Sequence, residues 1–244
     1  MKRHPHEFYR LMAVDIGTSV AQTIDLDLHR TFPNNRHFKA LSGGQKKAEL
    51  KTVLHAIAAK HPDIGYCQGL NYLAGMLLLV VGDVEKTFWL LEVVIRQLPG
   101  YYRPDMRGLR VDAMVLRLLV KEKAPDIDKT LDRLDMDLLL PTTKWFVCWF
   151  LETLPIETAM RIWDCLFHEG PKILFRVALT LLLKNRQRLC ACGSFCDASE
   201  LFKQITTDQS TVNCHDFIKD IFQMPGSFSS RHIQGLRDRC ENRV

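Results

Sequence analysis

The stretch Gln45–Pro62, QKKAELKTVLHAIAAKHP, decides the fold class. Its apolar residues recur at spacings of three and four, which is the period of one face of an α-helix. The residues on that face are Leu50, Val53, Leu54 and Ile57. The helix should end before Pro62, because proline disfavours helical backbone at the residue before it. This stretch therefore predicts a helix with one buried face.

The same periodicity continues almost to the end of the chain, interrupted by glycine and proline breakers. It predicts further helices at 65–81, 84–98, 109–123, 126–138, 142–153, 156–168, 172–189, 197–205, 214–223 and 229–241. Strand signals are nearly absent, because the β-branched residues follow helical spacing. The segment Lys144–Leu151 is apolar nearly all round, so it should lie in the middle of the core. The predicted fold class is all-α.

Length and composition exclude several classes of protein. The chain has 244 residues, of which 47% are hydrophobic and 25% charged, which is typical of one large folded domain or a domain with an appendage. The longest apolar runs, such as Met76–Val81, are much shorter than the roughly 18 to 20 residues that cross a bilayer. Basic residues alternate with acidic ones and the net charge is only +5, so nucleic acid is a poor partner. Without a visible secretory signal, we expect a cytoplasmic protein.

The eight cysteines lie mostly in apolar helical segments, where a thiol packs as a small hydrophobic group. A disulfide framework is therefore not expected. Cys190, Cys192 and Cys196, together with Cys214 and His215, could supply zinc ligands if the chain folded back on itself. The cluster lacks a C-x2-C pair, so a zinc-supported interaction domain is only a distant alternative and we predict no metal site.

Two polar motifs stand out from the helical pattern. In Ile24–Pro33, IDLDLHRTFP, Asp27 precedes Arg30 by three residues, a spacing at which its carboxylate can hold and aim the guanidinium. In Ile64–Asn71, IGYCQGLN, Gln68 stands between two glycines at the start of a predicted helix, where another backbone could approach closely. The residues alone favour a surface ion pair for the first motif and a local cap for the second.

Taken together and in this order, the two motifs resemble the finger motifs of TBC-domain GTPase-activating proteins for Rab GTPases. The matching residues are Ile24-x-x-Asp27-x-x-Arg30-Thr31-Phe32-Pro33 and Gly65-Tyr66-x-Gln68-Gly69-x-Asn71, with about 40 residues between the key side chains. Later segments resemble further landmarks of the family: Phe88–Leu91, Tyr101-Tyr102, Trp145-Phe146, Arg161–Asp164 and Glu169-Gly170. We therefore predict a TBC domain over residues 1–190 and a helical C-terminal extension over 191–244. That extension resembles the growth hormone-regulated branch of the family.

The resemblance implies a GTPase activator that supplies catalytic residues in trans and is not an enzyme on its own. Arg30 would stabilise charge developing on the phosphates of a GTP-bound Rab, and Gln68 would orient the attacking water. Asp27, Tyr66 and Asn71 would orient these two side chains or touch the partner. GTP and Mg²⁺ would be bound by the Rab, so the chain needs no cofactor of its own. The implied role is regulation of vesicle trafficking, with recruitment to membranes through the Rab and no direct membrane insertion.

One departure from the family pattern concerns the start of the sequence. Family domains normally begin with a helix carrying an R-x-x-V-W motif, whereas Glu7–Met12 resembles the helix that follows it. We therefore expect an N-terminally shortened domain whose missing packing partner lowers its stability by several kcal/mol, out of the usual total of about 5 to 15. The alternative function is a catalytically impaired TBC module that binds a Rab as a scaffold.

Overall fold

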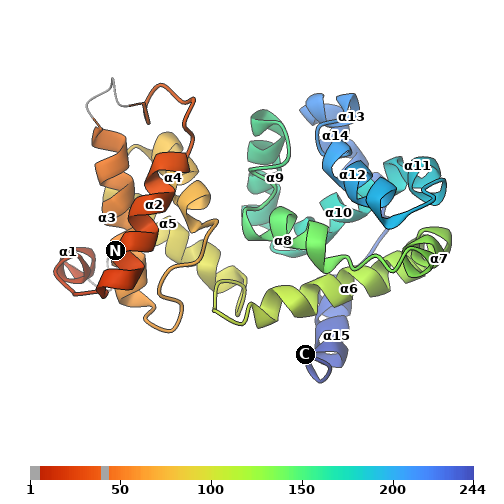
Figure 1. Cartoon of the computed structure of the whole chain (residues 1–244), viewed down its shortest axis with the longest axis horizontal. Helices are drawn as coiled ribbons and strands as arrows, with labels where there is room; N and C mark the ends of the chain where they lie inside the picture. Colours follow the sequence, from red (N-terminus) through yellow and green to blue (C-terminus); the bar gives the residue numbers. More distant parts are fainter. Residues whose placement is uncertain (1–5, 40–43) are drawn as a thin grey trace. The chain divides into compact units, whose positions relative to one another are not determined.

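The computed structural model describes residues 6–39 and 44–244, and every regular element in this part of the chain is a helix (Figure 1). The all-α prediction is confirmed. No helix among these residues is both long and apolar enough to cross a membrane. The chain packs as two compact units, Met1–Met106 and Arg107–Val244. The predicted division, with a TBC domain over 1–190 and an extension over 191–244, is not tested by this packing. It stays a prediction.

The first unit is built around one central helix. Its helices are α1 (Glu7–Met12), α2 (Thr18–Arg30), α3 (Gln45–Lys60), α4 (Leu70–Val81) and α5 (Val84–Gln97). Helix α3 contacts each of the other four. The four apolar residues that predicted this helix are all buried. The stretch that decided the fold class therefore forms the middle of the unit.

The predicted helix over 65–81 begins five residues late, so the prediction that Gln68 starts a helix is wrong. Helix α4 begins at Leu70, and the residues before it form a loop. Gly65 and Gly69 have φ angles of +59° and +108°, which a right-handed helix does not allow. Glycine adopts these angles at no steric cost, so the two glycines that flank Gln68 hold it in a loop.

The second unit is arranged around the buried helix α10. Its helices are α6 (Arg107–Lys123), α7 (Pro125–Arg133), α8 (Leu139–Val147), α9 (Ile156–Glu169), α10 (Lys172–Lys184), α11 (Arg186–Cys190), α12 (Phe195–Gln204), α13 (Gln209–Val212), α14 (Cys214–Gln223) and α15 (Ser230–Glu241). Helix α10 contacts α6, α8, α9, α11 and α14, and most of its side chains are buried. It is the core helix of this unit.

Within the segment Lys144–Leu151, residues 145–151 lie in the core of the second unit, as predicted, but the segment is not one helix. Helix α8 ends at Val147, and Trp149 and Phe150 have φ angles of +51° and +61°. The N–H of Phe150 then donates to the carbonyl of Trp145 at 2.7 Å. The prediction of a helix to residue 153 is wrong because this turn carries the aromatic rings into the core, where packing outweighs helical propensity.

Two other predicted helices are shorter than their apolar pattern. The helix predicted over 126–138 ends at Arg133, where Asp135 has a φ of +50° and the N–H of Met136 donates to the Leu131 carbonyl. The helix predicted over 172–189 is interrupted at Asn185, which separates α10 from α11. In both places apolar side chains on either side of the helix end remain buried. The apolar pattern therefore continues, and periodicity alone does not show that the helix has ended.

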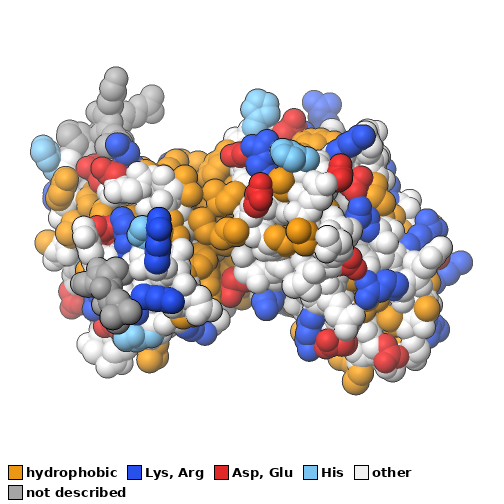
Figure 2. Space-filling view, turned by 90° about the horizontal axis from the view of Figure 1, so that it is seen from above, with side chains coloured by type: hydrophobic (Ala, Val, Ile, Leu, Met, Phe, Trp, Pro, Cys, Tyr) orange, Lys and Arg blue, Asp and Glu red, His pale blue; other side chains and the backbone are white. Residues whose placement is uncertain are grey.

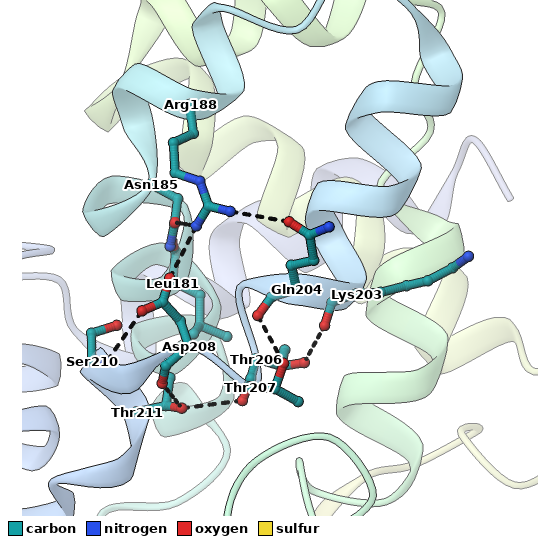
Figure 3. A network of polar contacts seen from close by, with 10 residues as sticks. All are labelled: Leu181, Asn185, Arg188, Lys203, Gln204, Thr206, Thr207, Asp208, Ser210 and Thr211. Atoms are coloured by element: carbon teal, nitrogen blue, oxygen red, sulfur yellow. Dashed lines mark hydrogen bonds and ion pairs between the residues drawn. The ribbon is translucent and has the colours of Figure 1, made fainter.

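The C-terminal helices pack onto the rest of the second unit at polar junctions. Arg188 on α11 is one of them: its Nη1 donates to Asn185 and Asp208 at 2.9 and 3.0 Å, and its Nη2 donates to Gln204 at 3.1 Å (Figure 3). One guanidinium thus joins α11 to the end of α12 and the start of α13.

A buried ion pair attaches the last helix. Arg237 on α15 donates from Nε and Nη2 to the two carboxylate oxygens of Asp112 on α6, each at 2.7 Å. Asp112 is only 1% exposed, so the two bonds from Arg237 stabilise a carboxylate that is removed from water.

We predict that Arg237→Met destabilises the chain by about 3 kcal/mol, because it leaves the buried Asp112 carboxylate without its guanidinium. Urea unfolding measures the change in the free energy of unfolding. Arg231→Met is the matched control, since Arg231 lies exposed on the same helix, and it should change stability by less than about 0.5 kcal/mol. Equal losses in the two variants would contradict the role of the pair.

Candidate functional site

Arg30 is the last residue of α2 and points away from the core of the first unit. The helix ends there because Thr31 is extended and Phe32 has a φ of +44°, which is uncommon for any residue other than glycine. The ring of Phe32 packs against Phe38 and Tyr72, which hold this conformation in place. The Arg30 side chain is 49% exposed at the end of α2.

Asp27 joins Arg30 to the loop that carries Gln68. Its Oδ1 accepts a hydrogen bond from Arg30 Nε at 2.7 Å and lies 2.6 Å from Arg30 Nη2. Its Oδ2 accepts a hydrogen bond from the Tyr66 hydroxyl at 2.5 Å. Asp27 is only 3% exposed, so the predicted ion pair is half buried and not a surface pair. One carboxylate therefore connects two segments that are 39 residues apart.

The charges of this cluster are fixed by their surroundings. Burial and the hydrogen bond to Asp27 raise the pKa of Tyr66 far above its usual 10, so its hydroxyl stays a neutral donor. Partial burial opposes the charge on Arg30, but the hydrogen bond and the negative charge of Asp27 outweigh it and raise the Arg30 pKa. Burial raises the pKa of the neighbouring Cys67 to about 11, which keeps that thiol protonated. The site thus presents one permanent cation to solvent.

Gln68 lies in the loop between α3 and α4 with its side chain exposed. The carbonyl of His61 anchors the start of this loop by accepting from the N–H groups of Ile64 and Gly65 at 3.0 and 2.8 Å. Within the part of the chain that the structure describes, no group hydrogen-bonds the Gln68 side chain. The loop is held by its backbone, which leaves the Gln68 amide available to a partner.

Asn71 is the remaining residue that the sequence singled out, and it is completely buried. Its Oδ1 accepts from the N–H of Gly69 at 3.0 Å, and its Nδ2 donates to the hydroxyl of Thr31 at 2.8 Å. Asn71 is therefore placed to shape the Gln68 loop and is not exposed to touch a partner. Thr31 belongs to the first motif, but its role could not be predicted, because a threonine beside an arginine carries no signal of a long-range contact.

Helix α4 approaches the end of α2 very closely at Gly75. A Cβ atom at this position would lie 3.1 Å from the ring of Phe32 and 3.2 Å from the methyl group of Thr31. These distances are tighter than ordinary van der Waals contact, so the absence of a side chain lets the two helices meet. The close approach brings the residues after Arg30 against the helix that follows Gln68.

The surroundings of Arg30 are positively charged. Residues 28–48 contain five lysines and arginines and no acidic residue. His29, Arg30, Arg36, His37 and Lys39 are all exposed. Lys, Arg and His side chains gather on the left part of the face drawn in Figure 2. This surface of the first unit favours a partner that carries negative charge.

The cysteine cluster does not form a metal site in the residues that the structure describes. Over 6–39 and 44–244, no group of three or more His, Cys, Asp or Glu side chains could hold a metal ion. The Cys190 thiol donates to Asp126 at 3.5 Å, and the Cys192 thiol donates to the Arg188 carbonyl at 3.4 Å. The zinc alternative therefore has no structural support.

Comparison with known protein families shows which family this chain belongs to. The model of the Rab-GTPase-TBC domain family matches residues 6–190. The chain belongs to the TBC family. It is 42% identical to "Growth hormone-regulated TBC protein 1-A" of Danio rerio, over 100% of this chain and 69% of that protein. It is 39% identical to "Growth hormone-regulated TBC protein 1" of Homo sapiens, over 100% of this chain and 73% of that protein. The similarity to these relatives includes residues 191–244.

Solved structures agree with this assignment. The crystal structure of the Chlamydomonas flagellar RabGAP TBC domain matches with a TM-score of 0.76 and 30% identity, over 92% of this chain and 74% of that one. The Ypt/Rab-GAP domain of Gyp1p matches with a TM-score of 0.73 over 92% of this chain and 79% of that one. At 18% identity the second match shows the fold alone. The predicted TBC fold is confirmed.

We predict that Tyr66→Phe destabilises this TBC domain by about 1 to 3 kcal/mol, because the buried Asp27 carboxylate loses a donor. Chemical unfolding followed by circular dichroism measures the change. Tyr9→Phe is the matched control, since Tyr9 is 59% exposed, and it should leave stability within about 0.5 kcal/mol of the parent chain. If both phenylalanines behave alike, the Tyr66 hydroxyl contributes nothing to the cluster.

Glu92 lies against His61, the residue whose carbonyl anchors the start of the Gln68 loop. Glu92 on α5 bonds His61 and accepts from Arg96 Nε at 2.6 Å. Burial raises the pKa of Glu92, but the His61 and Arg96 bonds outweigh it and hold the pKa below its usual 4.5. A lowered pKa in the folded state stabilises the fold above about pH 4.5, and that stabilisation is lost as the pH falls further.

The stability difference between the parent chain and Glu92→Gln should therefore be largest near neutral pH and shrink below about pH 4.5. Urea unfolding at a series of pH values measures it. Glu241→Gln, at an exposed glutamate on α15, serves as the control and should change stability by less than about 0.5 kcal/mol. A difference for Glu92→Gln that stays constant with pH would contradict the ionic role of Glu92.

Proposed function

We propose that this TBC domain accelerates GTP hydrolysis by a GTP-bound Rab-family GTPase, with Arg30 and Gln68 supplied in trans. The arrangement around Asp27 carries the proposal. It holds an exposed arginine at the end of α2 and ties the loop of an exposed glutamine to the same carboxylate. The family to which the chain belongs supports a Rab as the partner. In the cell this activity would regulate vesicle trafficking, with membrane recruitment through the Rab.

The chemistry of Arg30 suits transfer of a phosphoryl group to water. Its Nε and Nη2 lie against Asp27, whereas Nη1 has no partner among the described residues. A fixed, permanently charged fork can reach two phosphate oxygens and offset the negative charge that develops on them. Arginine fingers of this kind accelerate hydrolysis by roughly 10³ to 10⁵. The positive charge of residues 28–48 would favour approach of an anionic nucleotide site.

The chemistry of Gln68 suits orientation of the attacking water. A carboxamide offers both an acceptor for the water's proton and donors for a phosphate oxygen. GTPases commonly use a glutamine for this task, and here it would come from the activator. We propose that GTP and Mg²⁺ are held by the Rab, so that this chain contributes only side chains to the completed site.

We predict that Arg30→Ala and Gln68→Ala each lower the accelerated rate roughly a hundredfold or more. Single-turnover release of phosphate from a panel of GTP-loaded Rabs measures this rate. Arg110→Ala and Gln187→Ala are the matched controls, because both residues are exposed in the second unit, and they should leave the rate unchanged.

The same assay separates this proposal from its alternative. Binding of a GTP-loaded Rab without acceleration by the parent chain would identify a scaffold. Acceleration that survives both substitutions would show that other residues carry the activity.

A further inference from the structure

Thr31 is completely buried between the exposed Arg30 and the turn at Phe32. Its hydroxyl donates to the backbone carbonyl of Asp27 at 2.7 Å. The same oxygen accepts from Asn71 Nδ2 at 2.8 Å. A hydroxyl has one proton, and here it is committed to Asp27, so Thr31 can only accept from Asn71. This fixes the direction of the Asn71 amide.

The Asn71 amide passes the connection to the residue after Gln68. With its nitrogen on Thr31, the Asn71 oxygen is turned to the N–H of Gly69, which it accepts at 3.0 Å. Gly69 has the φ of +108° that ends the loop before α4. A continuous chain of hydrogen bonds therefore runs from the end of α2, through two buried side chains, to the backbone beside Gln68.

Gln68 is thus tied to α2 on both sides. Tyr66, two residues before it, bonds the Asp27 carboxylate, and Gly69, immediately after it, is reached through Asn71 and Thr31. One tie starts at Asp27 in the last turn of α2, which also carries Arg30, and the other starts at Thr31, directly after the helix. A buried polar chain in which every bond is made specifies one arrangement, because each unmade bond costs free energy.

We propose that Thr31 and Asn71 are positioning residues that hold the backbone of Gln68 in register with Arg30. This inference rests on the proposed function, since it concerns how the two side chains act together on one nucleotide. Neither Thr31 nor Asn71 touches the partner, because both are fully buried. They act through the loop that they hold.

Thr31→Val tests the link, because valine keeps the shape of threonine and removes the hydroxyl. The maximal accelerated rate should fall roughly tenfold to a hundredfold, since small displacements of a catalytic group cost this much. The concentration of activator needed for half of that rate should not change, because the exposed surface is the same. Thr31→Ser keeps the hydroxyl and should restore most of the maximal rate.

The second unit offers a matched control. Thr180 is also fully buried, and its hydroxyl also donates to the carbonyl four residues earlier, that of Arg176, at 2.8 Å. It lacks a side-chain partner corresponding to Asn71 among the described residues. Thr180→Val should therefore leave the maximal rate unchanged even if it lowers stability. Thermal unfolding of all variants identifies the temperature at which each is folded for the assay.

Two measurements test whether Thr31 acts through the Gln68 loop. In a chain that already carries Gln68→Ala, Thr31→Val should lower the rate much less than it does in the parent, because the group it positions is gone. Amide hydrogen exchange of the free protein, followed by NMR, should show faster exchange at Gly69 in Thr31→Val and unchanged exchange in Thr180→Val. The exchange measurement needs no GTPase.

The outcomes separate the inference from the proposed function. If the parent chain accelerates hydrolysis and requires Arg30 and Gln68, but Thr31→Val retains the full rate, the positioning role is overturned and the proposed function stands. Equal losses in Thr31→Val and Thr31→Ser would also overturn it, since they would indicate packing and not the hydroxyl. If the parent chain accelerates none of the Rabs, the proposed function fails, and the role of Thr31 in it fails too.

Discussion

The buried carboxylate of Asp27 is the interaction on which the candidate site depends. A charge removed from water is unfavourable unless it is paired and hydrogen-bonded. Asp27 meets this requirement with the Arg30 guanidinium on one oxygen and the Tyr66 hydroxyl on the other. Satisfying the carboxylate therefore forces the end of α2 and the loop after α3 to lie together. The same requirement orients Arg30, whose side chain remains 49% exposed.

The packed helices of the first unit support this interaction. Helix α3 contacts the other four helices, so the two segments that Asp27 joins are both supported by the same core. Gly75 lets α4 come close enough for the methyl group of Thr31 and the ring of Phe32 to pack against it. The candidate site is thus built where the end of α2 meets the start of α4.

Part of this molecule could be predicted from residue spacing, and the limits of that prediction have a physical cause. The 3.6-residue period located the helices, since it reports which side chains face the core. It failed at Trp149, where side chains stay buried although the backbone turns with a positive φ angle, and after Ile64, where the positive φ angles of Gly65 and Gly69 keep the chain in a partly exposed loop. Periodicity reports burial and not backbone conformation, so a compact apolar turn continues the pattern of the helix before it.

The resemblance to TBC proteins supplied what spacing could not, namely the prediction that Arg30 and Gln68 belong to one site. From the residues alone, a surface ion pair and a local cap were the favoured explanations. The burial of Asp27 replaces the first explanation with a half-buried pair, and the position of Gln68 in a loop before α4 replaces the second. Thr31 was missed because its contacts lie in the tertiary structure.

The sequence by itself determined the all-α fold, the helix with one buried face that begins at Gln45 and the pairing of Asp27 with Arg30, which are three residues apart on one helix. All of these depend on interactions within a few turns, and helical geometry sets them. Only the tertiary structure decided that Tyr66 shares the Asp27 carboxylate and that Thr31 reaches Asn71. These partners are 39 and 40 residues apart, so no spacing rule connects them. They meet because α2 and α4 must bury their apolar faces against α3, and the polar groups at their ends must then find partners.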